Sequence, residues 1–185
     1  SVLINSKAMN DTSKQFDNVI EKCKEIFDAK LRDYGAAWRI LRTSSITDQI
    51  YIKANRIRNI QIVGNQEIGD SIPSEFIGIV NYSIIALIQL EKGFCDNIDN
   101  DIEEIKRCYE RFAKNAKDLM MRKNHDYGEA WRNMRISSLD DIILMKLMRV
   151  KQIEDNQGVT EVSEGLDANY YDIINYAVFA LIQLL

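Results

Sequence analysis

Apolar residues recur at every third or fourth position over residues 16–31 and again over residues 102–120. This spacing is typical of an amphipathic helix that buries one face. Two further stretches, Glu75–Leu90 and Asn169–Leu185, are apolar around nearly their whole circumference, which is expected for helices at the centre of a bundle. The pattern predicts an all-α fold in which these two apolar helices pack against each other.

A seven-residue word after each amphipathic stretch indicates that the chain is duplicated. Asp-Tyr-Gly-Ala-Ala-Trp-Arg at Asp33–Arg39 recurs as Asp-Tyr-Gly-Glu-Ala-Trp-Arg at Asp126–Arg132, an offset of 93 residues. Over the 30 residues that start with each word, 14 positions are identical, and after one extra residue in the second copy the match resumes at an offset of 94. We therefore predict two tandem helical repeats that form an intrachain pseudo-dimer with one shared core. The expected units are repeat 1 at residues 11–92, a connector at residues 93–100 and repeat 2 at residues 101–185.

Each repeat is predicted to hold four helical segments. Gly35 and Gly128 supply a left-handed stop for the first helix, and a short segment that carries the tryptophan follows. The third helices are expected to begin at capping boxes of the form Ser-x-x-Asp, at residues 45–48 and 138–141. A polar loop at residues 63–74, which includes the only proline, is expected before the fourth helix of repeat 1.

Composition narrows the classes of function. The 185 residues carry 24 basic and 28 acidic side chains, a net charge of −4, so we expect no overall attraction for duplex nucleic acid. The apolar stretches are too short for a membrane span, and residues 1–8 lack the pattern of a signal peptide and are left out of the prediction of helices. Three isolated cysteines, Cys23, Cys95 and Cys108, predict reduced thiols and a soluble cytoplasmic protein.

The polar residues that occur in both repeats are the candidates for chemistry, because a duplication that preserved only a core would let its surface charges drift. A lysine stands one turn before each Asp-Tyr-Gly, and a Lys-x-x-Arg pair shares one face of each third helix, so these cations could converge on a phosphate chain. The phosphate- or nucleotide-binding candidates are Lys123, Asp126, Tyr127, Trp131, Arg135, Lys146 and Arg149, with the repeat 1 counterparts Lys30, Asp33, Tyr34, Trp38, Arg42, Lys53 and Arg56. The alternative is a structural role, with the tryptophans in the core and the arginines neutralised by Asp126 or Asp141.

Metal chemistry, if present, is predicted to use carboxylates. His125 is the only histidine, and neither a zinc site, a Ser-His-Asp triad nor a Gly-rich phosphate loop can be assembled from the sequence. Mg²⁺ takes one or two carboxylates together with substrate phosphates, so we expect it at Asp172 with Glu164 or Asp167, and less strongly at Glu75 of repeat 1. The alternative interpretation is that these acids are simply solvated. If one repeat is active and the other degenerate, repeat 2 is the better candidate.

The repeated Lys-x-x-Asp-Tyr-Gly-x-Ala-Trp-Arg block, the Lys-x-x-Arg pair and the Asn-Tyr tail of the fourth helix resemble the nucleotide-modification-associated domain family, first type, in its tandem bacterial form. That family in turn resembles the all-α, MazG-like nucleoside triphosphate pyrophosphohydrolases, which hydrolyse nucleotides with Mg²⁺. The pyrophosphohydrolase pattern is Glu-x-x-Glu on one helix and Glu-x-x-Asp on the next. Here Lys-x-x-Arg replaces the first pair, and only Glu75 and Asp172 match the second.

Two hypotheses follow from these residues. The first is a cytoplasmic, MazG-like tandem protein that binds a nucleotide or another phosphorylated small molecule and, in its stronger form, hydrolyses a triphosphate with Mg²⁺. The second is a non-catalytic helical module that binds another protein and whose paired charges are structural. The missing acidic pair favours binding or scaffolding over hydrolysis. The pseudo-dimer could also dimerise again, on which the sequence is silent.

Overall fold

The computed structural model describes residues 2–64, 72–98, 101–157 and 165–185. Both repeats have the same order of elements, a long helix, a short 3₁₀ helix and two further helices. In repeat 1 these are α1 (Val2–Tyr34), η1 (Ala37–Ile40), α2 (Thr43–Val63) and α3 (Ile72–Lys92). In repeat 2 they are α4 (Ile102–Tyr127), η2 (Ala130–Asn133), α5 (Ile136–Asp155) and α6 (Leu166–Leu184). The predicted all-α fold and its tandem organisation are confirmed.

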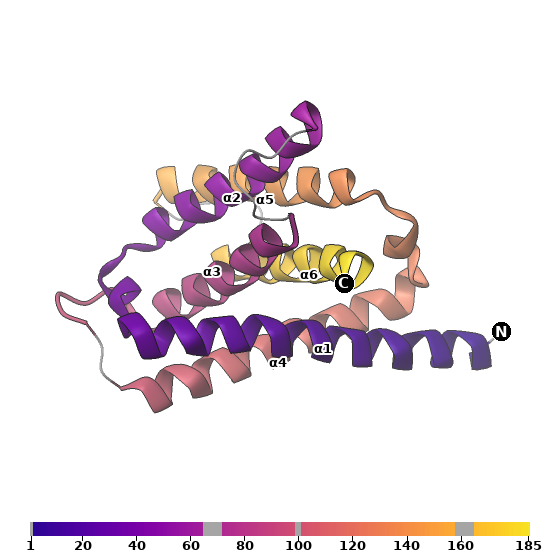
Figure 1. Ribbon diagram of the computed structural model, residues 1–185, viewed down its shortest axis with the longest axis horizontal. Coiled ribbons are helices and arrows are strands. Elements are labelled where there is room, and N and C mark those ends of the chain that lie inside the picture. Colours follow the sequence, from indigo (N-terminus) through magenta and orange to yellow (C-terminus); the bar gives the residue numbers. More distant parts are fainter. Residues whose placement is uncertain (1, 65–71, 99–100, 158–164) are drawn as a thin grey trace.

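The long helices lie in three layers, and each layer holds one helix from either repeat (Figure 1). α1 and α4 form one outer layer, α2 and α5 form the other, and α3 and α6 pack against each other between them. Buried side chains from both repeats join in one hydrophobic cluster. The two apolar helices therefore lie at the centre of the bundle, as their uniform hydrophobicity predicts.

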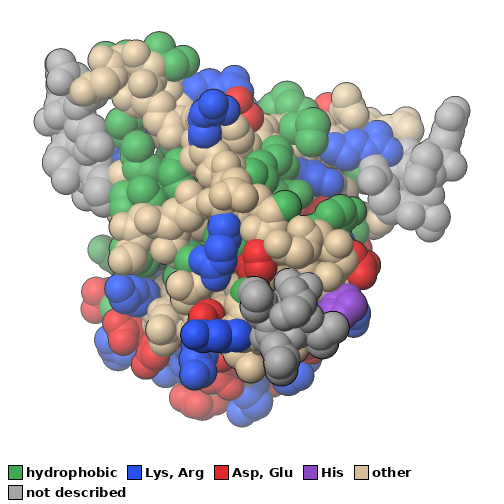
Figure 2. Space-filling view, turned by 90° about the vertical axis from the view of Figure 1, so that its right-hand side faces the viewer, with side chains coloured by type: hydrophobic (Ala, Val, Ile, Leu, Met, Phe, Trp, Pro, Cys, Tyr) green, Lys and Arg blue, Asp and Glu red, His purple; other side chains and the backbone are tan. Residues whose placement is uncertain are grey.

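Charge follows the layers. Figure 2 shows that Lys, Arg, Asp and Glu side chains gather over the part of this face where the α1 and α4 layer lies, whereas hydrophobic side chains are more frequent over the rest. The sequence explains the difference, because α4 buries one stripe that includes Ile105, Tyr109, Phe112 and Ala116, and the remainder of its surface is largely charged. Both helices of this outer layer expose polar side chains to water, whereas more than half of the residues of the middle layer are buried.

The turn between the first helix and the 3₁₀ helix is the same in both repeats. Gly35 and Gly128 have φ values of 64° and 58°, and the amide of each donates to a carbonyl four residues earlier. A residue without a Cβ adopts this left-handed conformation at little cost, so the predicted glycine stops are confirmed. The turn carries the tryptophan segment back toward the fourth helix of its own repeat.

The predicted starts of the third helices are wrong. α2 and α5 begin at Thr43 and Ile136, and the residues at their N-cap positions, Arg42 and Arg135, make no side-chain cap. The acids of the expected capping boxes instead bind cations across the α2–α5 layer, with Asp141 at 2.6 Å from Arg58. Pairing between the repeats has therefore replaced local capping.

Two other boundaries differ from prediction. α3 begins at Ile72, so Pro73 lies in the first helical turn rather than in a loop, at a position where its missing N–H costs no helical hydrogen bond. α1 begins at Val2 and thus includes nearly all of the segment left out of the prediction. With 21 residues, α3 is long and apolar enough by composition to cross a membrane. Of its 18-residue apolar stretch, 67% is buried within the bundle.

Candidate functional site

Each repeat encloses a pocket at the equivalent place, beside the first helix, the 3₁₀ helix and the fourth helix. The first pocket, in repeat 1, has a volume of about 540 Å³, and the second pocket, in repeat 2, about 240 Å³. The first pocket is lined by residues that include Lys30, Tyr34, Trp38, Lys53, Glu75, Gly78, Asn81 and Tyr82. The second is lined by residues that include Lys123, Asn124, Tyr127, Trp131, Asp172, Asn175, Tyr176 and Phe179. Seven of the fourteen predicted nucleotide-binding residues line one pocket or the other, namely Lys30, Tyr34, Trp38, Lys53, Lys123, Tyr127 and Trp131.

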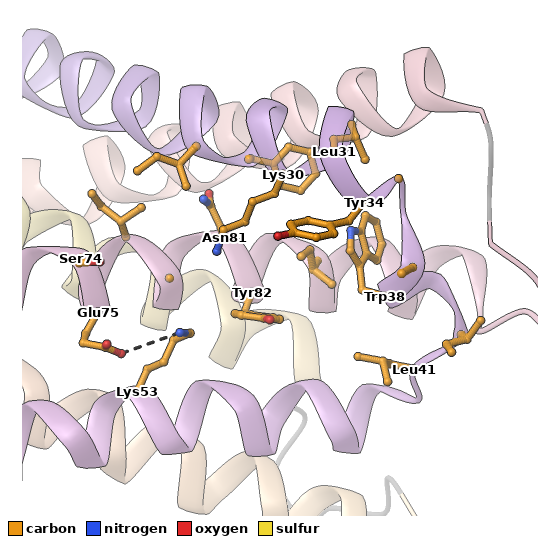
Figure 3. A pocket seen from close by; sticks show the side chains of 18 residues that line it. Lys30, Leu31, Tyr34, Trp38, Leu41, Lys53, Ser74, Glu75, Asn81 and Tyr82 are labelled. Carbon is orange, nitrogen blue, oxygen red and sulfur yellow. Dashed lines mark ion pairs between the residues drawn. The ribbon is translucent and has the colours of Figure 1, made fainter. Parts of the chain in front are cut away.

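The acidic residue of the first pocket is held deep against α2. Glu75 is 8% exposed and pairs with Arg56 at 2.5 Å and with Lys53 at 3.8 Å. Figure 3 shows Lys53 reaching from α2 toward Glu75, while Lys30 and Tyr34 extend from α1 toward α3. Lys30 forms no ion pair with any residue that the structure describes. One cation of this pocket is therefore free for a ligand.

The acidic residue of the second pocket lies one turn further along and pairs with both lysines. Asp172 contacts Lys123 at 2.8 Å and Lys146 at 3.1 Å. The residue at its place in repeat 1 is Gly78, where an added Cβ would lie 2.7 Å from Cδ of Lys53. Lys53 therefore lies directly over the glycine. The carboxylate of the fourth helix thus stands one turn earlier in repeat 1 than in repeat 2. It leaves Lys30 unpaired among the described residues of repeat 1, whereas in repeat 2 it neutralises the counterpart, Lys123.

The apolar walls explain the difference in volume. Trp131 is buried, and its ring stacks on Phe179 with the centroids 4.2 Å apart and the planes at 5°. Repeat 1 has Ile85 at the place of Phe179, and Trp38 is only partly buried. The second pocket is therefore filled by its own aromatic side chains, while the first leaves Trp38 and the largely exposed Tyr34 on its wall.

The asparagine shared by the two fourth helices is an anchor for the fold. Asn81 donates to the carbonyl of Cys23 at 3.0 Å, and Asn175 donates to the carbonyl of Ala116 at 3.1 Å, so each ties its fourth helix to the first helix of the same repeat. The Cys23 thiol beside this bond is fully buried, and burial raises its pKa to about 12. It is a core side chain, as the sequence predicts for an isolated cysteine.

The other predicted binding residues lie outside both pockets. Arg42 and Arg135 are exposed, as are Asp33 and Asp126, and Asp126 faces His125 at 3.4 Å. Arg56 is held by Glu75, and Arg149 is 3.4 Å from the side-chain oxygen of Gln152. The charge network that the sequence left as an alternative is thus partly present, but with partners other than the expected Asp126 and Asp141.

The described residues do not fit the expected magnesium site. No group of three or more Asp, Glu, His or Cys side chains that could hold a metal occurs within the described ranges. Asp172 and Glu75 are each bound by two cations, and Asp167 accepts a hydrogen bond from the amide of Ala168 at 2.9 Å. Glu164, the remaining predicted ligand, lies outside the described residues. The described carboxylates of the expected site are therefore already engaged by groups of the protein itself.

Sequence reasoning missed Asn124, which is 4% exposed and lines the second pocket. Its counterpart is Leu31, so a search for polar residues shared by both repeats discards it. The available indication was a polar residue at a buried position of an otherwise apolar stripe, four residues after Met120. The sequence also does not reveal the effect of Gly78, whose small size lets Lys53 lie against α3.

Comparisons with known proteins agree with the duplication. No curated protein and no solved structure matches the chain. The sequence model of one family, described as nucleotide modification associated domain 1, matches residues 30–90 and again residues 123–184. The two matches begin at Lys30 and Lys123 and include most of the residues that line the two pockets. The chain therefore belongs to the nucleotide modification associated domain 1 family and contains two copies of its domain in tandem.

Proposed function

We propose that the protein binds a nucleotide, or a closely related phosphorylated small molecule, in the first pocket. The observation that carries the proposal is the free cation: Lys30 has no ion-pair partner among the described residues, although it lines a pocket of about 540 Å³. A buried pocket of this size with a few polar groups is the usual form of a small-molecule site. Membership of a family associated with nucleotide modification supports the same class of ligand.

The charge balance of the first pocket favours an anion. Two lysines, Lys30 and Lys53, line the pocket together with one carboxylate, Glu75, which leaves a formal excess of one positive charge on the described lining. A phosphate group can accept hydrogen bonds from several such cations at once, and bonds between charged groups are the stronger ones. In the second pocket Asp172 already occupies both lysines. Repeat 1, rather than the repeat 2 favoured by the sequence, is therefore the better phosphate site.

Flat side chains beside the cations suit the rest of a nucleotide. The Tyr34 side chain is 72% exposed, and Trp38 and Tyr82 are partly buried on the same pocket. Unstacked bases are commonly bound on aromatic faces of this kind. The proposal is confined to binding, because Glu75 is the one carboxylate on the described lining and is held by Arg56 and Lys53.

Isothermal titration calorimetry with nucleoside mono-, di- and triphosphates, each with and without Mg²⁺, tests the proposal. We expect at least one of them to bind, and Lys30→Ala to weaken that binding by at least about tenfold, since one charge-assisted contact is worth about 1.4 kcal/mol or more. Gly78→Asp copies the acid of repeat 2 into repeat 1 and should weaken binding further. A separate assay for released pyrophosphate decides whether a bound triphosphate is also cleaved.

The matched control is Lys123→Ala, the same substitution in repeat 2. It removes a lysine that already pairs with Asp172, so it should leave the affinity for the phosphorylated ligand unchanged. Equal losses in the two variants would contradict a site in repeat 1. If no nucleotide binds at all, the proposal fails and the helical interaction module becomes the better hypothesis.

A further inference from the structure

The second pocket contains buried polar atoms that nothing in the structure satisfies. Eight side-chain nitrogen or oxygen atoms of the described residues are buried without a hydrogen-bond partner, and four of them belong to three side chains that line this pocket. They are both amide atoms of Asn124, Nε1 of Trp131 and Oδ1 of Asn175, and these three residues are 4%, 6% and 6% exposed. The first pocket has no such atom on Trp38 and has Leu31 in place of Asn124.

Unpaired atoms of this kind are costly and therefore informative. A buried polar group without a partner destabilises the fold, and more than about nine in ten such groups in folded proteins are paired. Leucine at the equivalent position of repeat 1 shows that the fold itself does not need an amide there. A molecule that enters the pocket and pairs with Asn124 and Trp131 would remove the penalty.

The donors and acceptors of these side chains specify which hydrogen-bonding groups a ligand must present. An asparagine amide offers one acceptor and one donor group side by side, and an indole offers one donor. The Trp131 ring stacks on Phe179 with the centroids 4.2 Å apart and has the guanidinium of Arg132 at 4.4 Å from its centroid, so its unpaired N–H is the group that it offers a ligand. Tyr127, exposed at 73%, and Tyr176 remain as flat walls.

The charge of the second pocket specifies the ligand further. Lys123 and Lys146 are paired with Asp172, so the pocket offers no free cation to a phosphate, and the carboxylate would repel one. The volume of about 240 Å³ lies below the range of drug-sized sites and suits a single ring system. Adjacent donors and acceptors on the edge of a flat ring are the defining feature of nucleobases.

We propose that the second pocket binds an uncharged nucleobase or nucleoside, with Asn124 and the indole N–H of Trp131 reading its edge. This is a second site with a different ligand, and it does not depend on the phosphate site of repeat 1. The duplication has in this way produced one pocket for an anion and one for a neutral heterocycle.

Calorimetry with the five common nucleosides and their free bases on the full chain tests this inference. We expect at least one to bind with a stoichiometry of one, and Asn124→Leu, which installs the repeat 1 residue, to weaken that binding at least about tenfold. The same substitution should raise the melting temperature of the unliganded protein, because it removes an unpaired amide. Phe179→Ile, which installs Ile85 of repeat 1, provides a second variant that should also weaken binding.

A local probe separates the two pockets. The chain has two tryptophans, so in Trp38→Phe all indole emission comes from Trp131, and the nucleoside should change its intensity in proportion to binding. Lys30→Ala should leave nucleoside affinity unchanged. The inference is overturned if no base or nucleoside binds, since water alone then fills the pocket, or if Lys30→Ala abolishes binding that Asn124→Leu retains. Either result leaves the phosphate site of repeat 1 to be judged by its own variants.

Discussion

The two repeats share a backbone plan but complete their buried hydrogen bonds differently. In repeat 1, Oδ1 of Asn81 accepts a hydrogen bond from the hydroxyl of Tyr109 at 2.7 Å, whereas Oδ1 of Asn175 in repeat 2 is buried without a partner. The residue of α1 at the place of Tyr109 is Phe16, which has no hydroxyl. Both repeats thus have the hydrogen bond from the asparagine that anchors the fourth helix to the first. Within the described ranges, only repeat 1 also has a hydrogen bond to the side-chain oxygen of that asparagine.

The α2–α5 layer contains a second case of the same kind. Thr47 on α2 is fully buried and is satisfied by the carbonyl of Thr43 at 3.1 Å and the hydroxyl of Tyr170 at 2.6 Å. Its counterpart on α5 is Asp140, fully buried with both carboxylate oxygens unpaired, and the counterpart of Tyr170 is Phe76. In both cases the polar side chain without a partner belongs to repeat 2, and phenylalanine stands at the place of its partner in repeat 1. The predictions below restore or remove these partners.

The largest effect is expected at Asp140. Burial, reinforced by the neighbouring charge of Asp141 and opposed by Arg58, raises the pKa of this carboxyl to about 7. The folded state therefore holds a proton that the unfolded state releases near pH 4, so stability should fall as the pH rises from about 4 to about 7 and then level off. Asp140→Asn should raise the free energy of unfolding at pH 8 by about 2–4 kcal/mol and leave it nearly unchanged at pH 4.

Urea denaturation at a series of pH values measures this effect. The control is Asp126→Asn, an exposed carboxyl whose loss should change stability little at any pH. A wild-type stability that does not vary between pH 4 and pH 7 would contradict the raised pKa of Asp140. An equal gain from both substitutions would indicate a general effect of net charge instead.

A smaller loss is expected from Tyr109→Phe, which makes repeat 1 resemble repeat 2. The substitution removes the hydroxyl that donates to Asn81 and leaves a second buried amide oxygen without a partner. It should lower the free energy of unfolding by about 1–3 kcal/mol with the same slope against urea. Burial also raises the pKa of Tyr109 well above its usual range, so the effect should be the same from pH 5 to pH 9.

These pairs mark the limit of prediction from sequence. The fold class, the duplication and the glycine stops follow from hydrophobic spacing and from one repeated word, because they depend on single segments. The partner of Asn81 comes from α4 of the other repeat, and the ion pair of Asp141 comes from Arg58 on α2. Which side chains meet across repeats depends on how the layers pack, so the sequence assigned Asp141 to a helix cap.

The site shows the same limit in another form. The lysines, the tyrosine and the tryptophan of each pocket are found by their retention in both repeats. What distinguishes the pockets are positions where the repeats differ, Gly78 against Asp172 and Leu31 against Asn124. A search for residues retained in both repeats finds the shared residues and passes over these differences. Their effect on the pockets becomes clear only from the ion pairs of Asp172.

A gain of about 1 kcal/mol is expected from Phe16→Tyr, which gives Asn175 the hydroxyl that Asn81 already has. Phe16 is 1% exposed, so the added oxygen is well placed for a buried bond but must fit without crowding. Thermal and urea denaturation should both show the gain. The double variant with Tyr109→Phe exchanges the arrangement between repeats and should return stability close to wild type. A loss in Phe16→Tyr that persists when Asn175 is replaced by alanine would point to crowding and contradict the comparison.

The smallest effect is expected at an exposed ion pair that both repeats have kept. Arg58 pairs with Asp141 at 2.6 Å, and the equivalent pair, Lys151 with Asp48, spans 3.6 Å on the other side of the α2–α5 layer. These side chains are largely exposed, and an arginine pair held at the shorter distance should contribute more than a lysine pair, though less than about 1 kcal/mol. Arg58→Ala should therefore lower stability slightly more than Lys151→Ala, and the difference should vanish in 1 M salt, where such charges are screened. If the difference persists in high salt, Arg58 contributes through the packing of its side chain rather than through its charge. The two pairs would then be equivalent in position but not in their electrostatic contribution.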